Sequence, residues 1–146
     1  MVCAAVSDTE GEIELLNSGV FSNGYFKIAV GRSKKDLTRT PAITITQMAR
    51  TYGNPTHIKI DVEGYEAAVL RGAAEALKQI SPVLFLELHN EMVRTDGGNP
   101  SAALDLLDQF GYVTFALSGE RISRPAILDK GIIRIVARRL DAGQTL

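Results

Sequence analysis

Residues 56–71, THIKIDVEGYEAAVLR, decide how the chain is interpreted. The first half carries a short apolar run at Ile58, Ile60 and Val62, which Gly64 closes. From Tyr65 onward helix-forming residues dominate and apolar side chains recur at helical spacing, which predicts a helix over residues 65–79. A buried strand that turns sharply into a helix places its carboxyl end at the edge of an open α/β sheet. Such folds bind their ligands at that edge.

Ionisable side chains follow this strand and the next apolar run, residues 83–88. Asp61 and Glu63 stand at the turn, and Glu87 and His89 stand at the end of the second run. Side chains alternate along a strand, so each pair is expected to share one face. If the two strands are adjacent and parallel, all four side chains converge. Carboxylates with one imidazole suit general acid–base catalysis or a hard divalent cation.

Simpler roles for the same residues stay open. Asp61, Glu63 and Glu66 can accept hydrogen bonds from backbone amides at the start of the following helix, and for Glu66 we favour this interpretation. A histidine at a strand end, such as His89, is as often hydrogen-bonded as catalytic.

The order of these motifs resembles a known family. Residues 57–77, HIKIDVEGYEAAVLRGAAEAL, and residues 82–89, PVLFLELH, are similar to the FkbM-type S-adenosylmethionine-dependent methyltransferases. The common signature of that family is Ile-Lys-Ile-Asp-Val-Glu-Gly, a Glu, Leu-x-Gly-Ala, and a strand that ends in Glu-x-His. Residues 4–8 and Gly11 resemble the family's third strand and its exit loop, so the resemblance covers nearly the whole chain.

The resemblance implies methyl transfer from S-adenosylmethionine to a hydroxyl oxygen of a small molecule or sugar. It places Asp61 between methyl donor and acceptor, as a general base or as a ligand of a divalent cation such as magnesium. Asp8 falls on the loop where this fold often reads the adenine amine, so Asp8 and Asp61 are the expected cofactor-binding residues. Asp61, Glu63, Glu87 and His89 are the expected catalytic residues, and no dedicated metal site is assigned.

The sequence departs from the family at its beginning. Methyltransferases of this fold normally start with a strand, a Gly-rich loop and a helix, followed by a strand whose terminal acid holds the ribose. No Gly-x-Gly run follows a strand in this sequence. We therefore expect residues 1–146 to form one N-terminally truncated methyltransferase-like domain. A non-catalytic domain that acts as a partner subunit or fragment is the alternative function, and a metal-dependent hydrolase is a third.

The expected fold is α/β: the C-terminal part of a doubly wound Rossmann-like sheet, mostly parallel, with a terminal antiparallel hairpin of residues 112–117 and 132–137. Without the family's first strands, the strand at residues 58–62 should become an exposed edge or pair with a segment of the first 45 residues. A homodimer could cover such an edge. We also expect strands at 2–6, 12–16, 25–30 and 41–45, loops at 34–39 and 91–99, and helices after an N-cap at Thr46 and from Pro100 to Gly111.

Composition narrows the function classes. The 146 residues are 45% hydrophobic and 23% charged with a net charge of −1, which gives no electrostatic reason to expect nucleic acid or a membrane as partner. Arg134, Arg138 and Arg139 are interpreted as a solvated face. The single Cys3 excludes an intramolecular disulfide, and its apolar neighbours predict a buried thiol. Without an apolar run of membrane-spanning length, a soluble cytoplasmic protein is expected.

Overall fold

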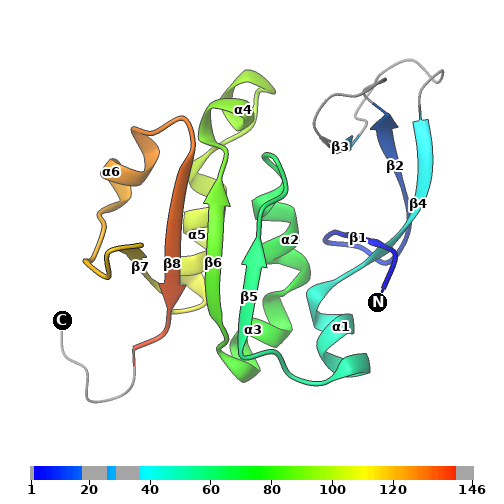
Figure 1. Cartoon of the computed structure of the whole chain (residues 1–146), viewed down its shortest axis with the longest axis horizontal. Coiled ribbons are helices and arrows are strands. Elements are labelled where there is room, and N and C mark those ends of the chain that lie inside the picture. The colour runs from blue at the N-terminus through cyan, green and yellow to red at the C-terminus, as the bar shows by residue number, and fades with distance from the viewer. Residues whose placement is uncertain (1, 18–25, 29–36, 141–146) are drawn as a thin grey trace.

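Two sheets make up the framework of the computed structural model, which describes residues 2–17, 26–28 and 37–140 (Figure 1). The first sheet has the order β1-β4-β2-β3. Its strands are β1 (Ala5–Val6), β2 (Gly11–Asn17), β3 (Phe26–Ile28) and β4 (Leu37–Ile43). The second sheet has the order β5-β6-β8-β7. Its strands are β5 (His57–Ile60), β6 (Val83–Leu88), β7 (Val113–Ala116) and β8 (Ile133–Arg138).

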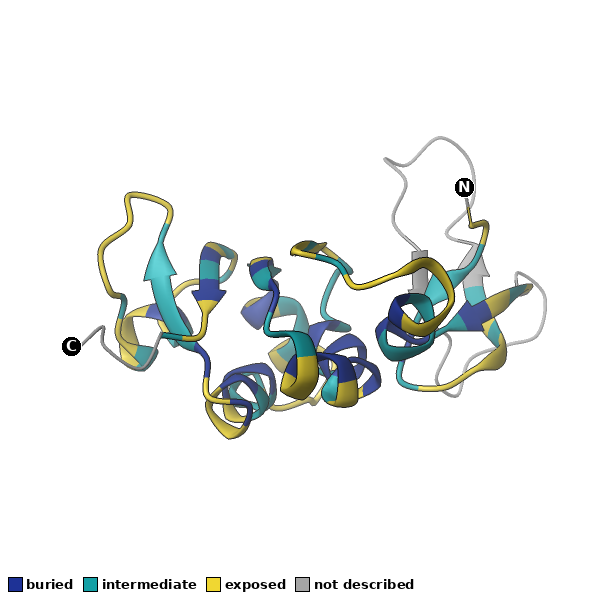
Figure 2. Cartoon of the chain, turned by 90° about the horizontal axis from the view of Figure 1, so that it is seen from below, coloured by how far each residue is buried: buried dark blue, intermediate teal, exposed yellow. Residues whose placement is uncertain are grey.

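Helices connect the strands of the second sheet. α2 (Glu66–Gly72) and α3 (Ala74–Ile80) lead from β5 to β6, and α4 (Asn90–Thr95) and α5 (Ser101–Gln109) lead from β6 to β7. α6 (Arg124–Leu128) lies between β7 and β8, while α1 (Ile45–Tyr52) joins the two sheets. α2, α3 and α5 lie along one face of the second sheet (Figures 1 and 2). Within the described part of the chain, no helix is long and apolar enough to cross a membrane.

The hydrophobic core lies between the second sheet and these helices. Alternate residues of β6, namely Leu84, Leu86 and Leu88, are buried, and the helices contribute the buried Leu70 and Leu77. The dark blue, buried positions of Figure 2 follow this layer. This alternation of burial is typical of a β-strand. Burial of these apolar side chains is the main stabilising contribution to this half of the fold.

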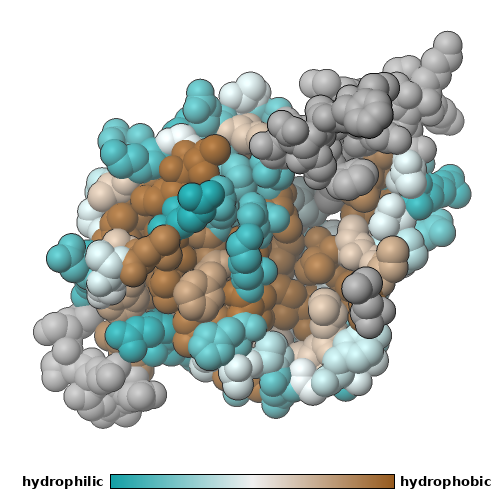
Figure 3. Space-filling model, in the orientation of Figure 1, coloured by the Kyte–Doolittle hydropathy of each residue, from teal (hydrophilic) through white to brown (hydrophobic). Residues whose placement is uncertain are grey.

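The opposite face of the second sheet, turned toward the viewer in Figure 1, is partly apolar and open. Phe85 is 41% exposed there. It pairs in register with Lys59 of β5 and with Val136 of β8, which pairs in turn with Phe115 of β7. Figure 3 shows hydrophobic residues gathered in the middle of this face, crossed by polar side chains.

The sheet topology confirms part of the expectation and corrects part of it. β5 is an edge strand, as expected, and β7 and β8 form the expected antiparallel hairpin. The strand directions also agree with the expectation of a mostly parallel sheet: β5, β6 and β7 run the same way, since β6 and β7 are both antiparallel to β8. Within this sheet β8 is the antiparallel strand, because it folds back from β7 and is inserted between β6 and β7. The correction concerns the N-terminal strands. The first residues form a sheet of their own, in which β1 pairs parallel with β4.

The helix expected over residues 65–79 is divided into α2 and α3 at Ala73. Gly72 ends α2 where its backbone packs against the loop after β1. A Cβ atom at Gly72 would lie 2.2 Å from the carbonyl oxygen of Ser7. The break therefore accompanies a close approach of two backbones, which the helical pattern of the side chains does not reveal.

Other boundaries also differ from the sequence interpretation. The N-cap of α1 is Thr44 rather than Thr46. The expected loops at 34–39 and 91–99 contain the start of β4 and the helix α4, and the link between the last two strands contains α6. β3 occupies residues 26–28 of the strand expected at 25–30, whose other positions lie outside the described residues. Cys3 is exposed, not buried, because the regular strand β1 begins only at Ala5.

Candidate active site

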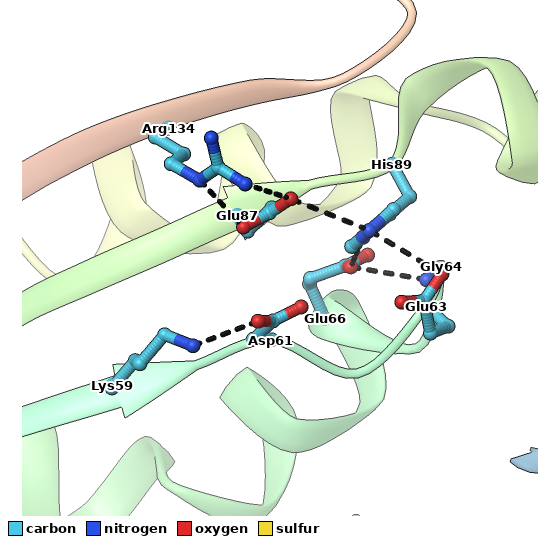
Figure 4. A network of polar contacts seen from close by, with 8 residues as sticks. All are labelled: Lys59, Asp61, Glu63, Gly64, Glu66, Glu87, His89 and Arg134. Carbon is cyan, nitrogen blue, oxygen red and sulfur yellow. Dashed lines mark hydrogen bonds and ion pairs between the residues drawn. The ribbon is translucent and has the colours of Figure 1, made fainter. Parts of the chain in front are cut away.

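The parallel strands β5 and β6 bring their carboxyl ends side by side, with Ile60 opposite Leu86. The residues that follow gather into one polar group (Figure 4), which we call the His89 cluster. One ligand atom from each of Asp61, Glu87 and His89 lies within 4.8 Å of the others. The expected convergence at the sheet edge is therefore present in the structure. The complete His89 cluster consists of Asp61, Glu63, Glu66, Glu87 and His89.

The turn after β5 places Glu63 in this cluster by an unexpected route. β5 ends at Ile60 rather than Val62, so Asp61 and Glu63 do not alternate along a strand. Glu63 has a φ of 51° and Gly64 a φ of 91°, both in the left-handed region. A non-glycine residue in this region stores strain, a feature that gathers at functional sites. The turn directs Glu63 toward the imidazole, with its Oε2 3.4 Å from Nε2 of His89.

His89 and Glu66 form a buried pair at the centre of the cluster. Both side chains are 3% exposed, and Nδ1 of His89 lies 2.7 Å from Oε1 of Glu66. The same Oε1 accepts a hydrogen bond of 3.0 Å from the backbone N–H of Gly64. The amide-binding role favoured for Glu66 is thus confirmed but incomplete, since Glu66 also fixes the orientation of the imidazole. Sequence spacing alone gave no signal for this second contact.

Two cations bind the outer carboxylates of the cluster. Arg134 of β8 donates two hydrogen bonds to Glu87, from Nε at 2.8 Å and from Nη2 at 3.0 Å. Lys59 of β5 donates to Asp61 at 2.7 Å. Neither partner was expected from the sequence, in which Arg134 was interpreted as part of a solvated face. The register of β6 and β8 sets Arg134 opposite Glu87, and cross-strand pairs of opposite charge are the signal that could have found it.

A cleft of about 840 Å³ opens beside the cluster. Asp61, Glu63, Gly64 and Tyr65 form its wall at the end of β5. From the sequence, the loops at 94–99 and 118–124 are both expected to flank this edge and to shape an acceptor pocket; the first of them contributes Asp96 and Gly98 to the lining. The second expected loop, residues 118–124, supplies no described residue of the lining, because it follows β7 at the far edge of the sheet. On the other side the lining consists of residues 2–4 before β1 and of residues of the first sheet, namely Val2, Cys3, Ala4, Ala5, Val6, Ile13, Leu15, Thr38 and Thr40.

Asp8 lies apart from the His89 cluster. Its Oδ2 accepts hydrogen bonds from Nε of Arg71 at 3.2 Å and from Nη2 at 2.9 Å. This pair ties the loop after β1 to α2. The cofactor-binding role of Asp8 stays a prediction; the contact that the structure shows for Asp8 is the ion pair with Arg71.

The fold and the site together define an α/β protein with a carboxylate–imidazole cluster beside a cleft. Comparison with known families goes further: residues 1–114 match the methyltransferase FkbM domain. The chain belongs to this family, and every member of the His89 cluster lies within the matched residues. No curated protein matches the chain, and neither does any solved structure.

Proposed function

We propose that the chain transfers a methyl group from S-adenosylmethionine to a hydroxyl oxygen of a small molecule. The observation that carries the proposal is the convergence of Glu63, His89 and their partners beside a cleft, in a chain of the FkbM methyltransferase family. Methyltransferases generally use S-adenosylmethionine as methyl donor.

The described residues fit this donor. The cleft volume of about 840 Å³ is sufficient for a nucleoside-sized ligand, since ligand pockets typically measure about 300–1,000 Å³. Asp61 stands on the wall of the cleft and can accept hydrogen bonds from sugar hydroxyls, the role that an acidic residue has in dinucleotide-binding folds. Val62 and Tyr65 on the same wall offer apolar surface for a base.

The residues of the cluster suggest how the acceptor is activated. When bound, S-adenosylmethionine supplies an electrophilic methyl group on a sulfonium. The cleft would hold the acceptor hydroxyl in line with it, a positioning effect that contributes much of the rate in such displacements. Glu63 would accept the hydroxyl proton, since Asp61 is bound to Lys59 at 2.7 Å. General-base catalysis of this kind contributes about 10²–10⁴-fold.

The lining of the cleft narrows the class of acceptor. Apolar side chains such as Ile13, Leu15 and Val93 dominate it, and only a few polar groups stand among them. A free sugar would leave most of its hydroxyls without hydrogen-bonding partners in such a cleft. The proposed acceptor is therefore a small molecule with an apolar body and one hydroxyl, rather than a sugar.

Calorimetric titration with S-adenosylhomocysteine, the product of the donor, tests the proposal. We expect micromolar binding by the 146-residue chain, and at least tenfold weaker binding by Asp61→Asn. Glu75→Gln is the matched control, because Glu75 is an exposed carboxylate paired with Arg50 at 2.6 Å and lies outside the site. Absence of binding by a folded sample would overturn the proposed function.

Two observations favour the alternative of a non-catalytic partner subunit. β5 is the edge of its sheet, and the sequence has no Gly-rich loop after a strand to approach the donor. A domain of this kind would leave donor binding to another chain. In that case the titration shows no heat with the isolated chain, and binding appears only after a partner chain is added.

A further inference from the structure

The two ring nitrogens of His89 have different surroundings: Nδ1 is hydrogen-bonded to Glu66, and Nε2 faces the carboxylates of Glu63 and Glu87. Nδ1 lies 2.7 Å from Oε1 of the buried Glu66, an arrangement in which Nδ1 is protonated and its N–H donates a hydrogen bond to the carboxylate. Nε2 of the neutral ring is then a lone-pair acceptor. It points toward Oε2 of Glu63 at 3.4 Å and Oε1 of Glu87 at 4.0 Å, and among the described residues it makes no hydrogen bond.

Acceptors that face one another in this way repel unless a cation or a hydrogen-bond donor lies between them. Four carboxylates belong to the cluster, and among the described residues the cationic side chains that bind it are Lys59 and Arg134. With a neutral His89 the network therefore keeps two uncompensated negative charges in a half-buried position. One divalent cation would neutralise them and would give Nε2 a partner.

From this geometry we propose that Asp61, Glu87 and Nε2 of His89 bind a divalent metal cation. Their ligand atoms already lie within 4.8 Å of one another, so small side-chain movements suffice to enclose an ion. Glu66 has the part that carboxylates often have behind metal-binding histidines: it holds Nδ1–H and thereby turns Nε2 toward the ion.

The ligand set favours particular ions. Two carboxylates and one imidazole form a mixed oxygen and nitrogen set, which suits Mn²⁺ or Fe²⁺ better than Ca²⁺, an ion that takes oxygen ligands. Mg²⁺ keeps several waters and also prefers oxygen, so it should bind more weakly than Mn²⁺. Binding of the ion does not depend on methyl transfer. Its catalytic role, lowering the pKa of the acceptor hydroxyl beside Glu63, rests on the proposed function.

A proton on Nε2 is the competing explanation of the same geometry. An imidazolium would donate to Glu63 and Glu87 and would add one positive charge, which leaves the network one charge short of neutral. The two explanations predict different metal binding. A protonated Nε2 has no lone pair to coordinate an ion, whereas an unprotonated Nε2 can serve as the third ligand.

Electron paramagnetic resonance with Mn²⁺ alone, without methyl donor or acceptor, decides between them. The full 146-residue chain is titrated with MnCl₂, and free Mn²⁺ is followed by its six-line spectrum. We expect one bound ion per chain, displaced by Mg²⁺ only at a concentration at least tenfold higher. Binding of Mn²⁺ with no binding of S-adenosylhomocysteine would overturn the proposed function and leave the metal site standing.

Two ligand variants and one control make the assignment specific. Asp61→Asn and Glu87→Gln remove partly exposed ligands at little risk to folding, and each should weaken Mn²⁺ binding at least tenfold. Glu75→Gln should leave the affinity unchanged. Two results would overturn the inference: no bound Mn²⁺ at millimolar concentration, or the same affinity in Asp61→Asn, Glu87→Gln and the control.

Discussion

Glu66 is the residue on which the geometry of the site depends. It is 3% exposed, and its Oε1 contacts both the backbone N–H of Gly64 and Nδ1 of His89. Burial of a carboxylate is unfavourable unless hydrogen bonds compensate it, and these two contacts do so. One side chain thus fixes the strained turn after β5 and the orientation of the imidazole.

We expect Glu66→Gln to uncouple these two effects. Glutamine keeps the shape and one oxygen acceptor but loses the charge, so the free energy of unfolding should fall by about 1–2 kcal/mol in urea titrations. The ¹⁵N shifts of His89 should show a weaker preference for the proton on Nδ1, and Mn²⁺ affinity should fall about 10–100-fold.

A purely structural Glu66 would give a different result. The stability would fall in the same way, but the tautomer of His89 and the affinity for Mn²⁺ would stay at the wild-type values. Glu75→Gln, which removes one negative charge on α3 away from the site, serves as the control for charge alone.

Tyr112 gives the chain a pH dependence in alkali. The residue is 3% exposed and its hydroxyl donates to the carbonyl of Pro82 at 3.0 Å. Burial raises the pKa of Tyr112 to about 12 from its ordinary value of 10.0. The unfolded chain therefore loses this proton first, so the contribution of Tyr112 is complete below about pH 10 and is lost as the pH rises toward 12.

Tyr112→Phe should remove this dependence. At pH 7 the variant loses one buried hydrogen bond, about 1 kcal/mol of the free energy of unfolding. Between pH 10 and 12 its stability should decline less than that of the wild type, as followed by urea denaturation at each pH. Tyr52→Phe is the control, because Tyr52 is 64% exposed. Parallel pH curves for Tyr112→Phe and the wild type would contradict the assignment.

For individual residues, the sequence predicted which side chains gather at the site but not which of them contact one another. Asp61, Glu87 and His89 could be placed together because the ends of adjacent parallel strands must meet. The contact of His89 with Glu66 depends on the direction of a turn, and Glu63 enters the cluster only because its φ is 51°. Side-chain alternation predicts neither. The exposure of Cys3 was not predicted either, because an apolar run does not show at which residue strand pairing begins.

Among the secondary-structure elements, α1 illustrates how one residue sets a boundary. Thr44 has an extended backbone with φ −90° and ψ 154°, and its Oγ1 accepts from the N–H of Gln47 at 3.0 Å. Thr46, the cap expected from the sequence, lies in the first turn, where its Oγ1 accepts a longer bond of 3.5 Å from the N–H of Ala76. The sequence pattern does not distinguish Thr44 from Thr46 as the N-cap, whereas the backbone conformation does.

The two threonines provide a matched pair of variants. Thr44→Ala should lower the free energy of unfolding by about 1 kcal/mol, the usual cost of losing an N-cap. Thr46→Ala should cost about half as much or less, because its hydrogen bond is long and its position is helical. Thermal and urea unfolding of both variants measures the difference. If Thr46→Ala proved the more destabilising change, the sequence assignment of the cap would be the correct one.

Elements with a strong periodic pattern were predicted, and elements set by tertiary contacts were not. The strand β6 and the helix α5 follow apolar patterns that burial confirms. The division between α2 and α3 follows from the approach of Gly72 to Ser7 across the molecule. α4 and α6 are short helices of six and five residues, too short for periodicity to distinguish them from loops.

For the molecule as a whole, the uncovered surface of the second sheet is the main consequence of the topology. α2, α3 and α5 cover one face, whereas the other presents Phe85, 41% exposed, beside the unpaired edge of β5 (Figures 1 and 3). The edge at β5 was expected from the sequence. The sequence did not predict the open face, which depends on which side the helices pack.

An unpaired strand edge next to exposed apolar surface favours association with a second copy of the chain. We expect sedimentation velocity to show a dimer whose fraction rises with protein concentration. Phe85→Ser should weaken the dimer at least tenfold, because it removes the largest exposed apolar side chain of the open face. Leu117→Ser is the matched control: Leu117 is 64% exposed but follows β7 at the other edge of the sheet. A monomer at every concentration, or equal weakening by both variants, would show that this face is not where two copies meet.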